Sequence, residues 1–392
     1  MSAYYVKRIA QFRNMLCGMR DVFINALGCF LPGEPVGNRE IEDHIGRVGG
    51  APCKFKSLVL RQNRIKARHY ALDKNGAATH SNSGMAALAL KDAIARSEIS
   101  VKDIAYLATS TTIGDLMVPG LASHVHALSG IRPIEIASFQ SVCASSLMAF
   151  KSAWLQLRAG EHDCAAVCGS EFASRYFRPG FYEGTLAYQQ TGEVPLNAAF
   201  LRFTLSDGAG AAILESKPNE RQPSLRIKWI NLRSYADRFE TCMIAGGVRR
   251  NGHTDYWGDY HSPAEAMEAG ALVLSQDFDL MRRMLPVWVS HYLSLIDDGL
   301  IKIPEIDHVV SHYSSQSLRE EVVKLLTAAG AMIDERKWFS NLASKGNTGA
   351  ASIFILLEEL YRSGALKPGE QILCHVPESG RALNGFMLLE VV

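Results

Sequence analysis

The sequence is short of the features that mark several large classes of protein. Lys and Arg total 41 and Asp and Glu total 40, so a net charge near zero gives no reason to expect a nucleic-acid partner. No apolar run reaches the roughly 18 residues that suggest a membrane span. Residues 1–20 are basic but lack the continuous apolar segment of a signal peptide. We therefore expect a cytoplasmic protein without membrane association. A mitochondrial-type presequence is an alternative for this basic segment.

The eight cysteines also lack a pattern. None forms a CxxC pair, and a chain without a secretory signal should keep its thiols reduced. Cys164 and Cys168 lie four residues apart in a strand-like run, where they would share a face and pack as small hydrophobic residues. His124 and His126 are also more simply structural. No metal site is predicted.

The length of 392 residues allows one large domain or two, and two segments of the chain show the same order of elements. Each has an apolar strand that ends in polar residues, a helix that starts on small residues and stops at glycine, and a second apolar strand. Cys143 and Gly160 are 17 residues apart, and so are Asn347 and Gly364. Matching spacing of this kind indicates a duplicated α/β unit.

The hydrophobic pattern gives these halves a fold class. Strands that are apolar throughout are typical of sheets covered by helices on both faces. The helix in each segment carries a stripe with a period of 3.6 residues: Leu147, Phe150, Trp154 and Leu157 in the first, and Ile353, Leu356, Leu357 and Leu360 in the second. We predict an α/β protein with pseudo-symmetric halves at residues 21–220 and 221–392. Residues 1–20 would form an extension that packs late or frays.

Equivalent positions of two such halves should lie close to the axis that relates them. Cys143 and Asn347 are equivalent because each opens a helix, and Ser110 and His312 are equivalent because each ends a strand. Cys143, His312 and Asn347 are therefore expected to converge, although they are far apart in the sequence.

These three side chains suit chemistry on thioesters. At a helix N-terminus the pKa of the Cys143 thiol should fall, and small neighbours would leave the sulfur accessible. A backbone N–H nearby can stabilise an oxyanion. His312 and Asn347 can donate hydrogen bonds to an enolate oxygen formed on loss of CO2. A lone cysteine here would more simply be a packed thiol, and it is the matched trio that favours a nucleophile.

Several motifs carry a family resemblance from about residue 21 to the C-terminus. They include SVCASSLMAF around Cys143, LSDGAGAAILE at the end of the first half and KGNTGAASI around Asn347. With them the chain resembles the β-ketoacyl-ACP synthase III enzymes of the thiolase superfamily. The resemblance implies a five-layer αβαβα arrangement, a homodimer, acyl-CoA or acyl-carrier-protein thioesters as substrates and no cofactor. It also implies that Cys143 takes the acyl group, while His312 and Asn347 stabilise the enolate of a malonyl-type extender.

The sequence departs from that family at three places. The histidine motif reads SHYSSQS, which puts Tyr313 where the family has glutamine. Val118 stands in GDLMVPG, where enzymes that join two acyl chains head-to-head carry a glutamate base. The C-terminal loop reads VPESGRALNG in place of a glycine-rich turn. The second departure argues against that head-to-head mechanism, and the third adds charge.

The C-terminal loop contains Glu378, Ser379, Gly380 and Arg381, and by the repeat it is the counterpart of the loop at Glu171. Ser379 and Gly380 are candidates for an oxyanion site. Glu171 and Arg381 would form a structural ion pair between the halves, or would act with Glu378 in a second, proton-transferring step such as ring closure. The PESGR wording resembles ketosynthase/cyclases that make cyclohexanediones and dialkylresorcinols from two acyl thioesters.

We therefore favour a ketosynthase of secondary metabolism that condenses a Cys143-bound acyl group with a malonyl- or β-ketoacyl-type thioester and closes a ring. Acyl carrier protein is the expected protein partner. The alternatives are a plain initiating synthase III of fatty-acid or polyketide synthesis, an acyltransferase on the same fold, and a non-catalytic ketosynthase partner subunit. Asn347 argues against the acyltransferase, and Cys143 argues against the partner subunit. Cys374 lies inside a predicted strand, which argues against a thiolase proper.

Overall fold

The computed structural model describes residues 19–250 and 253–392, so the predicted N-terminal extension lies almost wholly outside the described residues. The first half contributes β1 (Phe23–Phe30), β4 (Tyr106–Thr111), β5 (Glu135–Gln140), β6 (Cys164–Glu171) and β7 (Gly208–Glu215). The second half contributes β8 (Leu225–Ser234), β13 (His308–Ser311), β14 (Trp338–Phe339), β15 (Gln371–Pro377) and β16 (Leu383–Val391).

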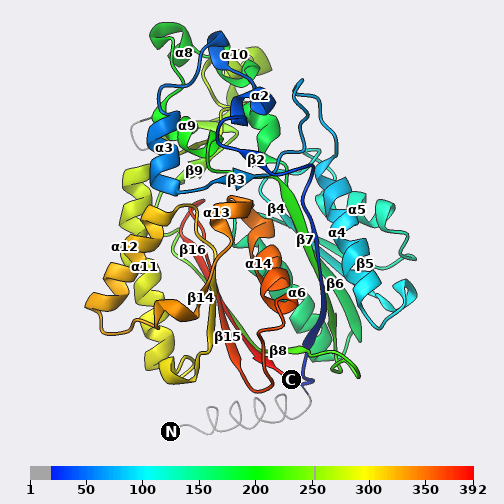
Figure 1. Cartoon of the computed structure of the whole chain (residues 1–392). Helices are drawn as coiled ribbons and strands as arrows, with labels where there is room; N and C mark the ends of the chain where they lie inside the picture. Colours follow the sequence, from blue (N-terminus) through cyan, green and yellow to red (C-terminus); the bar gives the residue numbers. More distant parts are fainter. Residues whose placement is uncertain (1–18, 251–252) are drawn as a thin grey trace, which may run out of the picture.

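These strands form one 10-stranded mixed sheet whose order repeats outward from its centre (Figure 1). The order is β1, β7, β6, β4, β5 in the first half and β8, β16, β15, β13, β14 in the second. In each half the outer strands are parallel and the inner ones antiparallel. The halves join where Phe23 and Ile24 pair with Arg226 and Leu225. The predicted duplication is confirmed by this repeated topology.

Helices cover the sheet on both sides and also fill the space between its halves. α6 (Ser145–Ala159) and α14 (Ser352–Arg362) contact strands of both halves, and Phe150 stacks on Phe354 with ring centroids 4.6 Å apart. α4 (Asn82–Arg96) and α5 (Leu121–Ser129) cover the first half, and α11 (Phe278–Asp297) and α12 (Gln316–Ala328) cover the second (Figure 1). Helices and half-sheets therefore alternate in the predicted αβαβα order.

Shorter elements gather mainly at one end of the sheet, at the top of Figure 1. They are β2 (Val36–Gly37), α2 (Ile41–Ile45), α3 (Lys56–Asn63), β3 (Ala67–Arg68), α7 (Gly180–Glu183), α8 (Leu186–Thr191), α9 (Leu196–Arg202), β9 (Met243–Ile244), β10 (Gly247–Arg250), β11 (His253–Tyr256), α10 (Pro263–Glu268), β12 (Ser275–Gln276) and α13 (Leu342–Lys345). A 3-10 turn at Gly349–Ala351 leads into α14. Among the described helices, none is long and apolar enough to cross a bilayer.

The close packing of helix on sheet depends on small residues. α4 lies so near β1 that a Cβ on Gly28 would stand 2.3 Å from the backbone N of Ala93 and 2.4 Å from the carbonyl O of Ala89. On β6, Cys164 and Cys168 both face the core on the α4 side. The prediction that these two cysteines share a buried face is confirmed.

Candidate active site

The structure brings Cys143, His312 and Asn347 together. The Sγ atom of Cys143 lies 3.0 Å from Nε2 of His312, and all three residues line one cavity. Cys143 precedes α6 by two residues, His312 directly follows β13, and Asn347 precedes the 3-10 turn before α14 by two residues. The predicted convergence is therefore confirmed.

The cavity spans about 940 Å³, a volume that includes the solvent at its mouth. It lies at the carboxyl ends of the parallel strands of both halves, and its wall is mainly apolar: Ile113, Val142, Phe172, Leu201, Leu205 and Met243 contribute to it. Cys143, His312 and Asn347 are each 5% exposed or less. Such a site can enclose an acyl chain and keep water from a reactive intermediate.

The predicted lowering of the Cys143 thiol pKa is wrong. Burial raises this pKa well above its ordinary value, and the nearby carboxyl groups of Glu378 and Glu171 raise it further. Burial also lowers the pKa of His312 to about 4. At neutral pH the pair is a neutral thiol beside a neutral imidazole. The helix end stabilises a thiolate too weakly to offset the loss of water around it.

Asn347 is held on three sides. Its Oδ1 accepts a hydrogen bond from the Gly349 N–H at 2.9 Å. Its own N–H donates to the carbonyl of Thr204 at 3.2 Å, and its carbonyl accepts from the Ser206 N–H at 2.8 Å. Because the side-chain oxygen is occupied, the NH₂ group is the part left to donate to a ligand. The segment that holds Asn347, residues 204–206, comes from the first half and was not predicted as part of the site.

Glu171 and Arg381 do not form the predicted ion pair. The Oε1 atom of Glu171 accepts from the N–H and hydroxyl of Thr112, at 3.0 and 2.7 Å, and from the Ala350 N–H at 3.0 Å. Arg381 is exposed, and its Nε donates to the carbonyl of Phe239. The guanidinium stays in contact with water and so avoids the free-energy cost of burying a charge. Glu171 therefore links the two halves without help from Arg381, and burial raises its pKa to about 7.

Glu378 lies buried beside the loop that carries Cys143. It is 3% exposed, and its Oε1 accepts a hydrogen bond from the Ser141 hydroxyl at 2.7 Å. Burial raises the pKa of Glu378 to about 7, and hydrogen bonds from Ser141 and the neighbouring backbone only partly offset this effect. A carboxyl group with this pKa can gain or lose a proton near neutrality. The Ser141 contact gave no signal in the sequence.

The predicted oxyanion loop is fixed against a neighbouring segment. The carbonyl groups of Ser379 and Gly380 accept hydrogen bonds from the N–H groups of Met243 and Cys242, at 2.9 and 2.8 Å. Ser379 lines the cavity. A Cβ on Gly380 would stand 2.8 Å from Oε1 of Glu378, so this position has no room for a side chain. The role of these residues toward an oxyanion stays a prediction.

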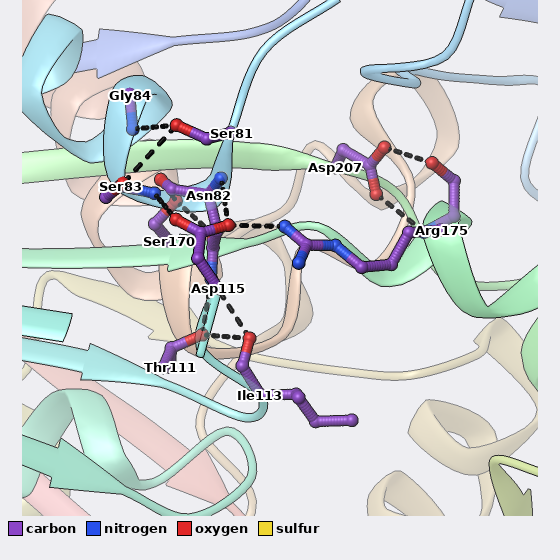
Figure 2. A network of polar contacts seen from close by, with 11 residues as sticks. Ser81, Asn82, Ser83, Gly84, Thr111, Ile113, Asp115, Ser170, Arg175 and Asp207 are labelled. Carbon is purple, nitrogen blue, oxygen red and sulfur yellow. Dashed lines mark hydrogen bonds and ion pairs between the residues drawn. The ribbon is translucent and has the colours of Figure 1, made fainter. Parts of the chain in front are cut away.

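Figure 2 shows the polar network that holds the loop after β4, which brings Ile113 to the cavity wall. Asp115 accepts from the N–H groups of Asn82 and Ser83, at 2.9 and 2.8 Å, and pairs with Arg175 at 2.6 Å. Partial burial would raise the pKa of Asp115, but the bonds from Arg175, Ser83 and Asn82 prevail and hold it at about 2. The charged carboxylate thus anchors the wall of the site to the start of α4.

A Glu378→Gln variant should react faster than the wild type with iodoacetamide at Cys143. The carboxylate raises the pKa of the thiol, so a neutral isostere should increase the thiolate fraction several-fold at about pH 8. Because the pKa of Glu378 is about 7, the difference should shrink at lower pH, where the wild-type carboxyl is itself protonated. The alkylation rate is measured by intact-protein mass spectrometry over a range of pH.

Glu390→Gln is the matched control. Glu390 lies on β16 opposite Gln371, at the end of β15 away from Glu378, and it pairs with Arg226 and Lys228. Its alkylation rate should equal that of the wild type. An unchanged or slower rate in Glu378→Gln would show that this carboxylate does not control the thiol.

Comparisons with known proteins match each half of the chain. Residues 66–179 match the N-terminal domain of thiolase, and residues 297–386 match the C-terminal region of 3-oxoacyl-[acyl-carrier-protein] synthase III. The β-ketoacyl-[acyl-carrier-protein] synthase III of Clostridium perfringens is 24% identical over 91% of this chain and 95% of its own length. That of Rhodospirillum rubrum is also 24% identical, with the same coverage. The chain is thus similar to thiolase in its first half, and to synthase III in its second half and along most of its length.

Solved structures agree with this fold. The chain superposes on AbyA1, a tetronic acid condensing enzyme, with a TM-score of 0.74, 20% identity and coverage of 94% of this chain and 99% of AbyA1. It superposes on OleA of Xanthomonas campestris with a TM-score of 0.71, 20% identity and coverage of 95% and 99%. At this identity the likeness establishes the thiolase-like fold. The predicted cyclohexanedione and resorcinol subgroup stays a prediction.

Proposed function

We propose that this protein forms carbon–carbon bonds by Claisen-type condensation of an acyl group on Cys143 with a second, malonyl- or β-ketoacyl-type thioester. The 3.0 Å contact between Cys143 Sγ and His312 Nε2 carries the proposal, because it sets a nucleophile beside a base in an apolar cavity. The similarity to synthase III along 91% of the chain supports it.

In the first step the Cys143 sulfur attacks the carbonyl carbon of an acyl thioester. His312 accepts the thiol proton as the new C–S bond forms. The bond to the leaving thiol group then breaks, and the departing thiolate takes the proton from His312. Because both residues are neutral at rest, charge separates only when a substrate is bound, which limits side reactions of the buried sulfur.

In the second step the extender thioester binds with its carbonyl oxygen near His312 and Asn347. Loss of CO2 from a malonyl-type extender leaves its electron pair as an enolate. The Asn347 NH₂ group and His312, in the neutral tautomer that carries its proton on Nε2, stabilise the charge on oxygen. The enolate carbon attacks the acyl carbonyl and the Cys143 sulfur leaves. A proton from solvent restores the thiol, so atoms and charge balance.

The proposal extends to ring closure in secondary metabolism. A β-ketoacyl-type extender has an acidic carbon between two carbonyl groups, and its second condensation needs a proton acceptor. Glu378 supports this role because it is buried beside the Cys143 loop and has a pKa of about 7. Arg381 takes no part in this scheme. A plain initiating synthase III needs no such acid and is the second candidate.

Intact-protein mass spectrometry with a panel of acyl-CoA and acyl-carrier-protein donors tests the first step. The wild type should gain the mass of one acyl group, and Cys143→Ala should gain none. The acylated protein is then mixed with malonyl- and β-ketoacyl-type thioesters, and the product is identified by mass. A linear β-ketoacyl product with every extender would support the plain synthase, and no acylation from either carrier would overturn the proposal.

We also propose a homodimer formed through β5, which is the last strand of the sheet and is largely exposed. The side chains of Leu116, Met117 and Val118 are 56%, 77% and 80% exposed. Ser138 of β5 accepts a hydrogen bond from the Ala122 N–H, which places this apolar loop beside the strand. An open sheet edge flanked by exposed apolar side chains favours pairing with a second copy.

Met117→Asp should shift the protein from dimer to monomer in sedimentation velocity. A charge at a buried interface has to lose its water without gaining a partner. Leu300→Asp is the control, since Leu300 is exposed in the loop after α11, and it should sediment like the wild type. A wild-type monomer, or a Met117→Asp dimer of unchanged affinity, would contradict the proposed interface.

A further inference from the structure

A second cavity adjoins the active-site cavity. It spans about 490 Å³, including the solvent at its opening, and lies between the helices α11 and α12 and the strands β13 and β15. Trp288, Val322 and His375 line both cavities, so they form the neck between them. Leu326 and Trp338 lie on the wall of the second cavity, away from the neck. We call this second space the extension cavity.

Two apolar stripes run from the active-site cavity into the extension cavity. Figure 1 shows α11 and α12 side by side against the second half of the sheet. The stripe residues recur at intervals of three or four: Met281, Leu285, Trp288 and Tyr292 on α11, and Leu318, Val322 and Leu326 on α12. At a rise of 1.5 Å per residue, the eight residues from Leu318 to Leu326 extend about 12 Å. The two helices thus line a continuous apolar trough.

The neck lies next to the nucleophile. The His312 N–H donates to the carbonyl of His375 at 2.9 Å, and His312 contacts the Cys143 sulfur at 3.0 Å. Ser311, which lines the extension cavity, is the residue before His312. A chain attached to Cys143 therefore reaches the neck within a few bonds.

The extension cavity suits a hydrocarbon chain. None of the described residues that line it is Asp, Glu, Lys or Arg. Its one histidine, His375, has both ring nitrogens occupied, by Ser311 and Asn384, and stacks on Phe386 with ring centroids 4.4 Å apart. Burial lowers the pKa of His375 to about 3, so the ring is neutral. The walls offer apolar contact and no charge.

We propose that the extension cavity holds the far end of the acyl group on Cys143, and that this protein loads long acyl chains. The proposal rests on the function proposed above and adds the class of substrate. An extended chain advances about 1.2 Å per bond, since one residue of three backbone bonds spans at most about 3.6 Å. The part of the trough beyond the neck, from Val322 to Leu326, is about 6 Å long and therefore takes about five carbons, in addition to those between Cys143 and the neck.

The test compares loading of palmitoyl-CoA and butyryl-CoA on Cys143 by intact-protein mass spectrometry. In Leu326→Trp, where the larger side chain fills the extension cavity, the ratio of the palmitoyl rate to the butyryl rate should fall at least tenfold. Val322→Phe narrows the neck from a half-buried position and should lower the same ratio. It serves as the test if Leu326→Trp fails to fold. Lys324→Trp adds the same indole to the exposed side of α12 and should leave the ratio within twofold of wild type.

The outcomes separate this inference from the proposed function. A wild type that loads butyryl but not palmitoyl groups, or a ratio unchanged in both cavity variants, overturns the extension cavity as the acyl site and leaves the condensing function intact. A wild type that loads neither donor, from CoA or from acyl carrier protein, overturns the proposed function and this inference with it.

Discussion

An Asn347→Ala variant should still acquire an acyl group on Cys143 but should condense it at least a hundredfold more slowly. Removing one preorganised donor to a developing oxyanion costs on the order of 10²–10³ in rate. Acylation needs the Cys143 and His312 pair, and among the described residues no hydrogen bond joins Asn347 to either of them. Acyl loading is followed by intact mass, and condensation by the amount of product and of CO2 released.

The control for this variant is the neighbouring residue Thr348, whose hydroxyl contacts Ser352 at 3.0 Å. Thr348→Ser keeps that hydroxyl and should retain both steps. Equal loss of acylation and condensation in Asn347→Ala would show that Asn347 only supports the local fold, through its bond to Gly349. That result would remove the enolate role and leave the acyltransferase alternative.

Gly28→Ala should destabilise the protein by about 3 kcal/mol or more, which is a large effect for a single added methyl group. The new Cβ would stand 2.3 Å from a backbone nitrogen of α4, so the helix as a whole would have to move away from β1. Side chains of a packed interior cannot absorb such a shift locally. The free energy of unfolding is measured by urea titration of both proteins.

Gly180→Ala is the matched control, because a Cβ on Gly180 would meet no atom within 4 Å. Its free energy of unfolding should stay within about 0.5 kcal/mol of the wild type. Equal urea unfolding midpoints for Gly28→Ala and Gly180→Ala would mean that α4 does not pack this closely against β1.

The sequence was sufficient for the architecture and for the centre of the site. Spacing and hydrophobic period alone showed that Cys143 and Asn347 occupy equivalent places, and the strand order has the same repeat. These are properties of local pattern, which a single chain displays directly. The same repeat placed Glu171 and Glu378 on equivalent loops, and both carboxyls are buried in the structure.

What the sequence did not reveal depends on burial and on long-range contacts. The thiol pKa of Cys143 was predicted to fall because a helix begins nearby, but burial of the sulfur raises this pKa instead. Arg381 stands three residues from buried Glu378 in the PESGR loop, yet its side chain is exposed and donates a hydrogen bond to the carbonyl of Phe239. The extension cavity exists only because α11 and α12 lie side by side, and no local motif reports such a space.

The duplicated sheet sets the stoichiometry of the enzyme. A chain with two related halves has two equivalent positions at which each catalytic group could stand. The counterpart of His312 is Ser110, a fully buried residue whose hydroxyl donates to the carbonyl of Cys168. The counterpart of Cys143 is an amide, Asn347. Each half thus supplies what the other lacks, and neither could work apart. The proposed function therefore predicts one acyl group per chain, with the two halves contributing different groups to a single site.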